Sequence, residues 1–171
     1  MDIQIEDATG MQAIVRNLFV PYAHELSGMA GLDVRDDGTF GQPASLAADW
    51  PLAGVYPFLL RADGRLAGFA LVRRIGDDPA THEIGEFFVL RKYRRTGVGK
   101  YAACALFDRF PGHWDVRELL ANIPAQAFWR RIIADYTGGD FEDRQEYVEA
   151  YGREFVVQRF RSTQVASRVA T

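Results

Sequence analysis

A run of arginines and glycines in the middle of the chain has the composition of an anion-binding turn. It lies between a strand candidate at 83–90 and an apolar helical stretch that begins near residue 98. Glycine lets the backbone approach a ligand closely and adopt dihedrals that a Cβ would penalise. The first N–H groups of a helix lack internal partners, and the helix dipole adds partial positive charge there, so a phosphate is stabilised at such a terminus. The residues that make up this anion-binding turn are Arg94, Arg95, Thr96, Gly97, Val98, Gly99 and Lys100.

Two better-known phosphate loops do not fit this spacing. The turn lacks the G-x-x-x-x-G-K-[S/T] pattern of a P-loop, and it lacks the G-x-G-x-x-G pattern of a dinucleotide-binding fold. Arg91 and Lys92 bring the number of cations between residues 91 and 100 to five. An ordinary basic connection between a strand and a helix is the simpler alternative to a ligand site.

Composition limits the classes of protein that this chain can belong to. Its 171 residues are 48% apolar and 25% charged, which is enough for a full core and argues against disorder. The net charge of −3 argues against a nucleic-acid binder. The single cysteine, Cys104, excludes an internal disulfide and a cysteine-based zinc site, and it is expected to be a packed side chain. With no secretory signal and no apolar run of membrane-spanning length, we expect a cytoplasmic protein without membrane contact.

Apolar periodicity predicts one domain over residues 1–161, followed by a flexible tail at 162–171. A capping box at Thr9 and Gln12 is expected to open a helix at 10–27 that Pro21 kinks or splits, and 28–43 reads as loop. A short helix at 44–52 would be anchored by Trp50, and later helices follow the basic turn and Pro124. An Asp63-Gly64 turn predicts a hairpin. The expected strands lie at 2–7, 55–61, 65–75, 81–90, 114–120, 141–148 and 154–161.

These elements predict an α/β (α+β) fold with a mixed sheet. The strand at 114–120 should be parallel to the strand at 81–90, because a helix crosses between them. The strands before that pair should be antiparallel, since tight turns join them.

The segment from Glu86 to Gly99 resembles the acetyl-CoA-binding motif of the GCN5-related N-acetyltransferases (the GNAT superfamily). In that family a strand ends at the pantetheine arm, and an [R/Q]-x-x-G-x-[G/A] turn surrounds the pyrophosphate. The second family pattern, N-x-x-A-x-x-[F/L]-Y, is matched by Asn122, Ala125, Phe128 and Trp129, with tryptophan in place of tyrosine. The resemblance implies that the two central parallel strands splay apart and that pantetheine enters the gap. It implies coenzyme contacts from Phe88, Val89, Leu90, Asn122 and Trp129 and from the whole anion-binding turn.

Glu86 is the candidate general base. A carboxylate in an apolar strand needs a partner or a function, and partly apolar surroundings can raise its pKa toward neutrality. The resemblance implies a glutamate at the matching position, often acting through water. A salt bridge to an arginine is the structural alternative. Glu83 is a weaker candidate base, and His24 is the second choice because the first helix borders the acceptor pocket in the family.

Trp129 departs from the family pattern. The family tyrosine acts as a general acid near the coenzyme sulfur, whereas an indole releases no proton near neutral pH. We expect Trp129 to pack beside the coenzyme arm, and Tyr136 could replace the acid only if the end of its helix curls inward. Asn122 could cap its helix or contact pantetheine.

The sequence therefore predicts an acyltransferase that moves acetyl from acetyl-CoA to a primary amine by direct attack in a ternary complex. Backbone N–H groups near Phe88 and Val89 would polarise the thioester. No Ser or Cys nucleophile, metal or nucleic acid is expected, and the protein would be a monomer or homodimer. A non-catalytic acyl-CoA sensor on the same fold, favoured by Trp129, and a structural α/β protein are the alternatives.

Overall fold

The computed structural model describes residues 1–41, 46 and 51–163. Within these residues seven strands form one mixed sheet in the order β1-β2-β3-β4-β5-β7-β6. Every neighbouring pair is antiparallel except β4 and β5, which are parallel. This arrangement confirms the predicted mixed sheet. The strands are β1 (Ile3–Asp7), β2 (Val55–Ala62), β3 (Arg65–Arg74), β4 (Thr81–Val89), β5 (Gly112–Leu119), β6 (Glu142–Val148) and β7 (Arg153–Ser162).

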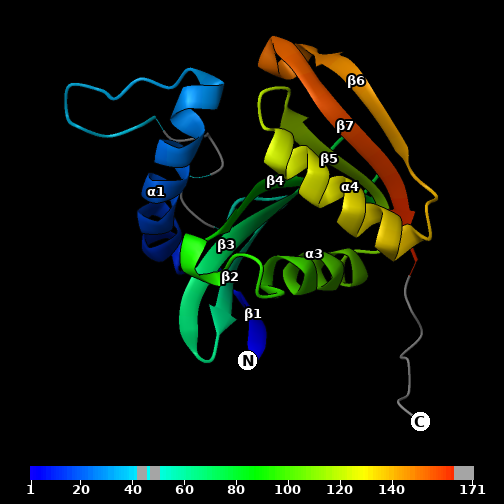
Figure 1. Ribbon diagram of the computed structural model, residues 1–171, viewed down its shortest axis with the longest axis horizontal. Helices are drawn as coiled ribbons and strands as arrows, with labels where there is room; N and C mark the ends of the chain where they lie inside the picture. Colours follow the sequence, from blue (N-terminus) through cyan, green and yellow to red (C-terminus); the bar gives the residue numbers. More distant parts are fainter. Residues whose placement is uncertain (42–45, 47–50, 164–171) are drawn as a thin grey trace.

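Helices cover both faces of the sheet (Figure 1). The α-helices are α1 (Gln12–Ala30), α3 (Val98–Arg109) and α4 (Ile123–Thr137), and two short 3₁₀ segments are η1 (Arg91–Tyr93) and η2 (Glu149–Tyr151). On β4, Phe87 packs against Trp129 of α4, whereas the next residue, Phe88, packs against Tyr22 of α1. Successive strand residues point to opposite faces, so α1 lies on one face of the sheet and α3 and α4 lie on the other. None of the described helices is both long and apolar enough to cross a bilayer.

The parallel pair opens partway along its length. β4 and β5 are paired only from Thr81 with His113 to Ile84 with Val116. Immediately beyond, the register between β3 and β4 shifts, and Gly85 is the extra residue of a β-bulge. A bulge bends its strand and increases the local twist, so β4 diverges from β5 after Ile84. The predicted splay is therefore present, and Glu86 is the first residue beyond the bulge.

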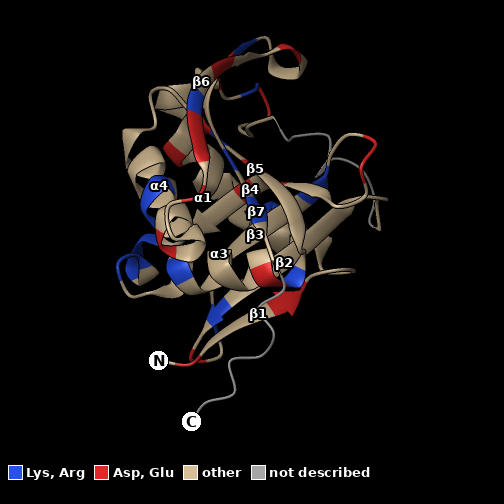
Figure 2. Cartoon of the chain, turned by 90° about the vertical axis from the view of Figure 1, so that its right-hand side faces the viewer, with Lys and Arg blue, Asp and Glu red and all other residues tan. Residues whose placement is uncertain are grey.

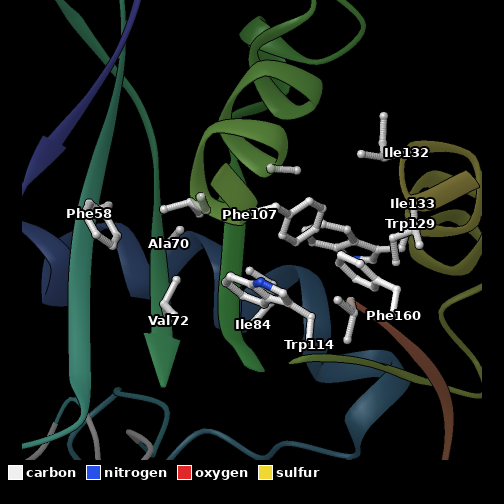
Figure 3. Packing of buried hydrophobic residues seen from close by; sticks show 13 residues of the cluster. Phe58, Ala70, Val72, Ile84, Phe107, Trp114, Trp129, Ile132, Ile133 and Phe160 are labelled. Carbon is white, nitrogen blue, oxygen red and sulfur yellow. The ribbon is translucent and has the colours of Figure 1, made fainter. Parts of the chain in front are cut away.

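The larger core fills the space between the sheet and the helices α3 and α4. Figure 3 shows its aromatic centre, in which Phe107 of α3 lies between Trp114 of β5, Trp129 of α4 and Phe160 of β7. The ring centroid of Phe107 is 4.8 Å from that of Phe160 and 5.0 Å from that of Trp114. A second cluster under α1 joins Val15 and Phe19 to side chains of β2, β3 and β4.

Several local expectations differ from the structure. Thr9 and Gln12 form no capping box; α1 begins after Met11 without a side-chain cap, and the Gln12 amide donates to the Leu46 carbonyl oxygen. The helix passes Pro21 without a break and continues to Ala30, so the predicted loop at 28–43 starts later.

The expected helix at 44–52, with Trp50, lies almost wholly outside the described residues, as does the tail from 164 onward. β7 extends one residue beyond the predicted domain, to Ser162, whose hydroxyl accepts from the Trp114 indole N–H.

Candidate active site

The anion-binding turn connects the end of β4 to α3. Gly97 has a φ of 96°, in the left-handed region, and directly precedes the first residue of α3. Arg95 also has a positive φ, 62°, which is uncommon for a residue with a Cβ. Among the described residues, the backbone N–H groups from Arg95 to Lys100 have no hydrogen-bond partner. Consecutive free N–H groups at a helix start can stabilise an anion, so the local geometry suits the anion-binding role that the sequence suggests.

Lys and Arg residues are blue in Figure 2. Ion pairs divide the cations of this segment into those that hold neighbouring elements together and those that remain available to a ligand. The Arg94 guanidinium donates to the Val89 carbonyl oxygen at 2.8 Å and pairs with Glu25 of α1, which also pairs with Arg91. Lys100 pairs with Asp135 of α4 at 2.8 Å. By contrast, Lys92 and Arg95 have no acidic partner in the part of the chain that the structure describes. The turn itself contains three of the five cations. Two of these three, Arg94 and Lys100, already form ion pairs with the helices α1 and α4.

Gly99 has a packing role that its motif does not reveal. A Cβ at Gly99 would lie 3.2 Å from the Phe128 ring of α4, whereas a Cβ at Gly97 would meet no atom within 4 Å. Gly99 therefore lets α3 approach α4, while Gly97 supplies the backbone conformation of the turn.

Glu86 projects from β4 toward α1. Burial raises the pKa of its carboxyl from the usual range to about 7, against two opposing influences, a hydrogen bond with the Tyr22 hydroxyl and the charge of Arg73. A carboxyl with a pKa near 7 can accept a proton at physiological pH and release it again. Glu86 is thus a competent base candidate.

Arg73 lies directly beside this carboxyl, across the bulge. Its guanidinium packs on Gly85, where a Cβ would be 2.6 Å from Nε, so a larger residue at this position would displace the Arg73 side chain. The Glu83 carboxylate forms two ion pairs, one with Arg73, whose Nε lies 2.8 Å from Oε1, and one with Arg117 of β5. The hydroxyl of Tyr151 accepts a 2.8 Å hydrogen bond from Arg73. Glu83 is therefore part of an ion-pair network, which argues against its role as the base.

The open ends of β4 and β5 leave backbone groups available. Leu90 N–H donates to the Ala67 carbonyl of β3. Since hydrogen-bonding direction alternates along a strand, Phe88 also points its N–H toward β3, and Phe87 and Val89 point theirs toward the splay. Of the two N–H groups that the sequence suggested as donors, that of Val89 points into the splay and that of Phe88 points toward β3. The Phe87 N–H, which sequence reasoning did not name, also points into the splay.

Comparison with known proteins identifies the family. The model of the "Acetyltransferase (GNAT) family" matches residues 15–133, well over half of the chain. The chain belongs to the GNAT acetyltransferase family. No curated protein gives a significant match to the sequence.

Solved structures of acetyltransferases share the fold. A GNAT acetyltransferase from Staphylococcus aureus Mu50 aligns with a TM-score of 0.65 at 12% identity, over 95% of this chain and 100% of that one. The yncA protein of Salmonella typhimurium, solved with its cofactor acetyl-CoA, aligns with a TM-score of 0.61 at 16% identity over the whole of both chains. An acetyltransferase from Bacillus subtilis in complex with CoA gives 0.59 at 13% identity, over 94% of this chain and 99% of that one. At these identities the likeness shows the fold alone.

The second GNAT pattern lies at the start of α4. The Asn122 side-chain oxygen accepts from Ala125 N–H at 3.2 Å, so the predicted helix cap is present. The amide NH₂ of Asn122 has no partner among the described residues and is free to meet a ligand.

Trp129 is a core residue at the GNAT tyrosine position, and Figure 3 shows it among the buried side chains of the larger core. Only 5% of it is exposed, and its ring lies 4.9 Å from Phe87 and 5.0 Å from Phe128 in edge-on contacts. Tyr136 does not take over as the acid, because its hydroxyl donates to Asp108 at 2.7 Å and its ring packs on Phe107. His24 is exposed on α1, with its ring 6.5 Å from that of Phe40.

Two further features complete the site. Tyr22 of α1 was not singled out by the sequence, because it belongs to no motif, and in the structure it lies close enough to Glu86 to influence the pKa of that carboxyl. No cluster of residues with metal-binding composition was found in the described part of the chain.

Proposed function

We propose that this protein transfers an acetyl group from acetyl-CoA to a primary amine by direct attack in a ternary complex. The observation that carries this proposal is the arrangement along β4. A carboxyl with a pKa of about 7 lies at the start of the splay, and free N–H groups of the anion-binding turn lie just beyond its end. Related folds have been solved with acetyl-CoA and CoA, which supports the same co-substrate here.

The chain's own groups divide the work of the reaction. The N–H groups from Arg95 to Lys100 would hold the pyrophosphate, with Lys92 and Arg95 nearby as free cations. Val89 and Phe87 would donate to the thioester carbonyl, and Leu90, Asn122 and Trp129 would border the pantetheine arm. Glu86 would accept the proton of the attacking amine.

The first experiment tests coenzyme binding by thermal unfolding. Acetyl-CoA at a hundredfold excess over its dissociation constant should stabilise the fold by about 2.7 kcal/mol. Gly97→Ala should weaken this effect because a Cβ strains the turn at its left-handed φ. Gly139→Ala is the matched control, since Gly139 has a φ of 93°, equally open surroundings and a position after α4. An unchanged melting curve at saturating acetyl-CoA would contradict the proposal.

The second experiment separates an enzyme from a sensor. The tryptophan at the family tyrosine position is the observation that favours a non-catalytic acyl-CoA-binding module. Acetyl-CoA-dependent thiol release should appear with at least one member of a panel of amines, peptides and aminoglycosides. Binding of acetyl-CoA without thiol release across the whole panel would favour the sensor.

A further inference from the structure

Arg73 and Glu86 point to the same face of the sheet. The cross-strand partner of Glu86 is Leu71 of β3, which belongs to the core cluster under α1. Residues two apart on a strand share a face, so Arg73 also points toward the α1 side. Its guanidinium lies over Gly85, the residue directly before Glu86, where a Cβ would be 2.6 Å from the Arg73 Nε. A cation therefore lies next to the candidate base at the start of the splay.

A row of alternating charges runs across this face of the sheet, and Arg73 is its first member. In order, the members are Arg73, Glu83, Arg117, Asp115, Arg159 and Glu146, and each forms an ion pair with the next. The row holds as many cations as anions, but the end beside Glu86 is a cation. Glu83 is shared between Arg73 and Arg117, so it neutralises the Arg73 guanidinium only in part.

The arginines of this row are more exposed than the acids between them. The side chain of Arg73 is 23% exposed and that of Arg117 17%, whereas that of Glu83 is 6% exposed. Asp115 is 12% exposed, and its two partners, Arg117 and Arg159, are 17% and 39% exposed. The guanidinium groups therefore shield the carboxylates from solvent, and a ligand on this side of the splay meets a cationic surface.

Tyr151 of η2 reaches Arg73 from the other side of the splay. The sheet order places β3 next to β4 and β7 next to β5, and η2 joins β6 to β7. The Tyr151 hydroxyl nonetheless accepts a hydrogen bond of 2.8 Å from the Arg73 Nη2. Among the described residues, the Arg73 Nη1 has no hydrogen-bond partner, and no group accepts the hydroxyl proton of Tyr151. Two donors from two elements are therefore left to a ligand beside Glu86.

We propose that the acceptor is an amino acid whose free carboxylate is held by Arg73 and Tyr151 while its amine lies at Glu86. The inference rests on the proposed acetyl transfer and names the class of its acceptor. Guanidinium groups bind carboxylates through short, charge-assisted hydrogen bonds. Because Arg73 and Glu86 are neighbours on one face, the carboxylate and the amine of the acceptor are separated by only a few bonds, as they are in an amino acid.

The carboxylate of the acceptor positions the amine and takes no part in bond making. The neutral amine nitrogen attacks the acetyl carbonyl carbon, an N–C bond forms and the C–S bond breaks. The amine proton passes to Glu86, which releases it to solvent, and the coenzyme thiolate takes a proton from solvent. The products are an N-acetylated amino acid and free coenzyme A.

Pairs of acceptors that differ only at the carboxyl group test this inference. The protein amino acids, β-alanine and γ-aminobutyrate are each offered as the free acid and as the amide, with acetyl-CoA saturating. For the best pair, kcat/KM of the acid should exceed that of the amide about 10- to 100-fold, the discrimination expected from hydrogen bonds to a charged group. The amine of the amide is the less basic of the two, so amine reactivity alone would favour the amide. A ratio of one or less for every pair that turns over would overturn the inference.

Arg73→Gln tests which residue reads the carboxylate. The acid-to-amide ratio should fall to near one, mainly through a higher KM for the acid, while Glu83 keeps its ion pair with Arg117. Arg73→Lys keeps the charge but loses the planar fork, so its ratio should be intermediate. Arg74→Gln is the matched control, because Arg74 is the exposed neighbour on β3 and points to the opposite face. Its ratio should equal that of the unchanged protein.

The ratio is measured within one preparation, so a loss of folded protein or a shift in the pKa of Glu86 affects both acceptors and cancels. Tyr151→Phe keeps the ring and removes one donor, and it should lower the ratio about 3- to 10-fold. An unchanged ratio in Arg73→Gln would overturn the role of Arg73. Turnover only with amines that lack a carboxylate would overturn this inference alone. Absence of thiol release with every amine tested would overturn the transferase proposal itself.

Discussion

The two faces of the sheet beside the splay have opposite chemical characters. On the face covered by α3 and α4, Phe107, Trp114 and Trp129 form a tight aromatic core. On the α1 face, Arg73 and Arg117 meet Glu83 in an ion-pair network. One face packs apolar rings against β4, and the other places charged groups beside it.

Each face also carries a glutamate whose pKa is raised by burial. Glu86 on the α1 face has Tyr22 and Arg73 as partners and a pKa of about 7. Glu118 of β5, which shares its face with Trp114 and Val116, is 4% exposed, and burial raises its pKa to about 9. Among the described residues neither of its carboxyl oxygens has a hydrogen-bond partner. A raised pKa alone therefore does not identify a catalytic base. A base must also have access to the reacting group and a partner for its carboxyl.

The strongest test of this comparison is the effect of each glutamate on turnover. Glu86→Gln should lower kcat by about 10²- to 10⁴-fold, the usual range for loss of a general base. Glu118→Gln should leave kcat within about twofold, because this side chain faces the core under α4. Steady-state kinetics on both variants decide, with acetyl-CoA affinity as the control for folding. Equal losses would mean that the two carboxyls do not differ in role.

Trp129 provides the next largest effect, on stability. Trp129→Ala should lower the free energy of unfolding by about 3–5 kcal/mol, because it empties a packed site between Phe87 and Phe107. Ile123→Ala, at a 63% exposed position on the same helix, should change it by no more than about 0.5 kcal/mol. Urea unfolding measures both variants. A small loss at Trp129 would place this ring outside the core.

Glu118 should make stability depend on pH. Its folded pKa of about 9 exceeds the unfolded value, so the folded protein binds more protons between about pH 4.5 and 9 and loses stability as pH rises through that range. The slope is up to about 1.4 kcal/mol per pH unit, which amounts to roughly 3 kcal/mol at pH 7. Glu118→Gln should therefore stabilise the protein at pH 7–8 and have little effect near pH 4.5. Unfolding curves with parallel pH dependence in both proteins would contradict this.

The smallest effect is expected at Tyr151, on the charged face. Tyr151→Phe removes the acceptor of the Arg73 hydrogen bond and should cost about 0.5–1.5 kcal/mol of stability. Tyr147→Phe is the control, since the Tyr147 hydroxyl has no hydrogen-bond partner within the described residues and its side chain is largely exposed. The urea midpoint of Tyr151→Phe should therefore be lower than that of Tyr147→Phe.

The sequence predicted features that depend on neighbouring residues. The amphipathic faces of α3 and α4 follow from local spacing, and the parallel pair follows from the helix that crosses between its strands; the structure contains both. The turn with free N–H groups is also present, whereas its binding of an anion stays a prediction. The capping box at Thr9 failed because the Gln12 amide instead bonds to Leu46, a contact that no local pattern encodes. Glu86 was identifiable as an acidic residue in an apolar strand, whereas its partner Tyr22 lies on another element and carries no motif. The commitment of Arg94 and Lys100 to Glu25 and Asp135 also depends on tertiary packing.

The position of Glu25 gives α1 a role as a thermodynamic link. The same helix face carries Tyr22, which influences the pKa of Glu86, and Glu25, which pairs with Arg94 one turn later. A ligand that displaced this segment would change both contacts at once. If the acceptor and the coenzyme favoured different positions of α1, each would alter the affinity of the other by the same factor, because such coupling is reciprocal.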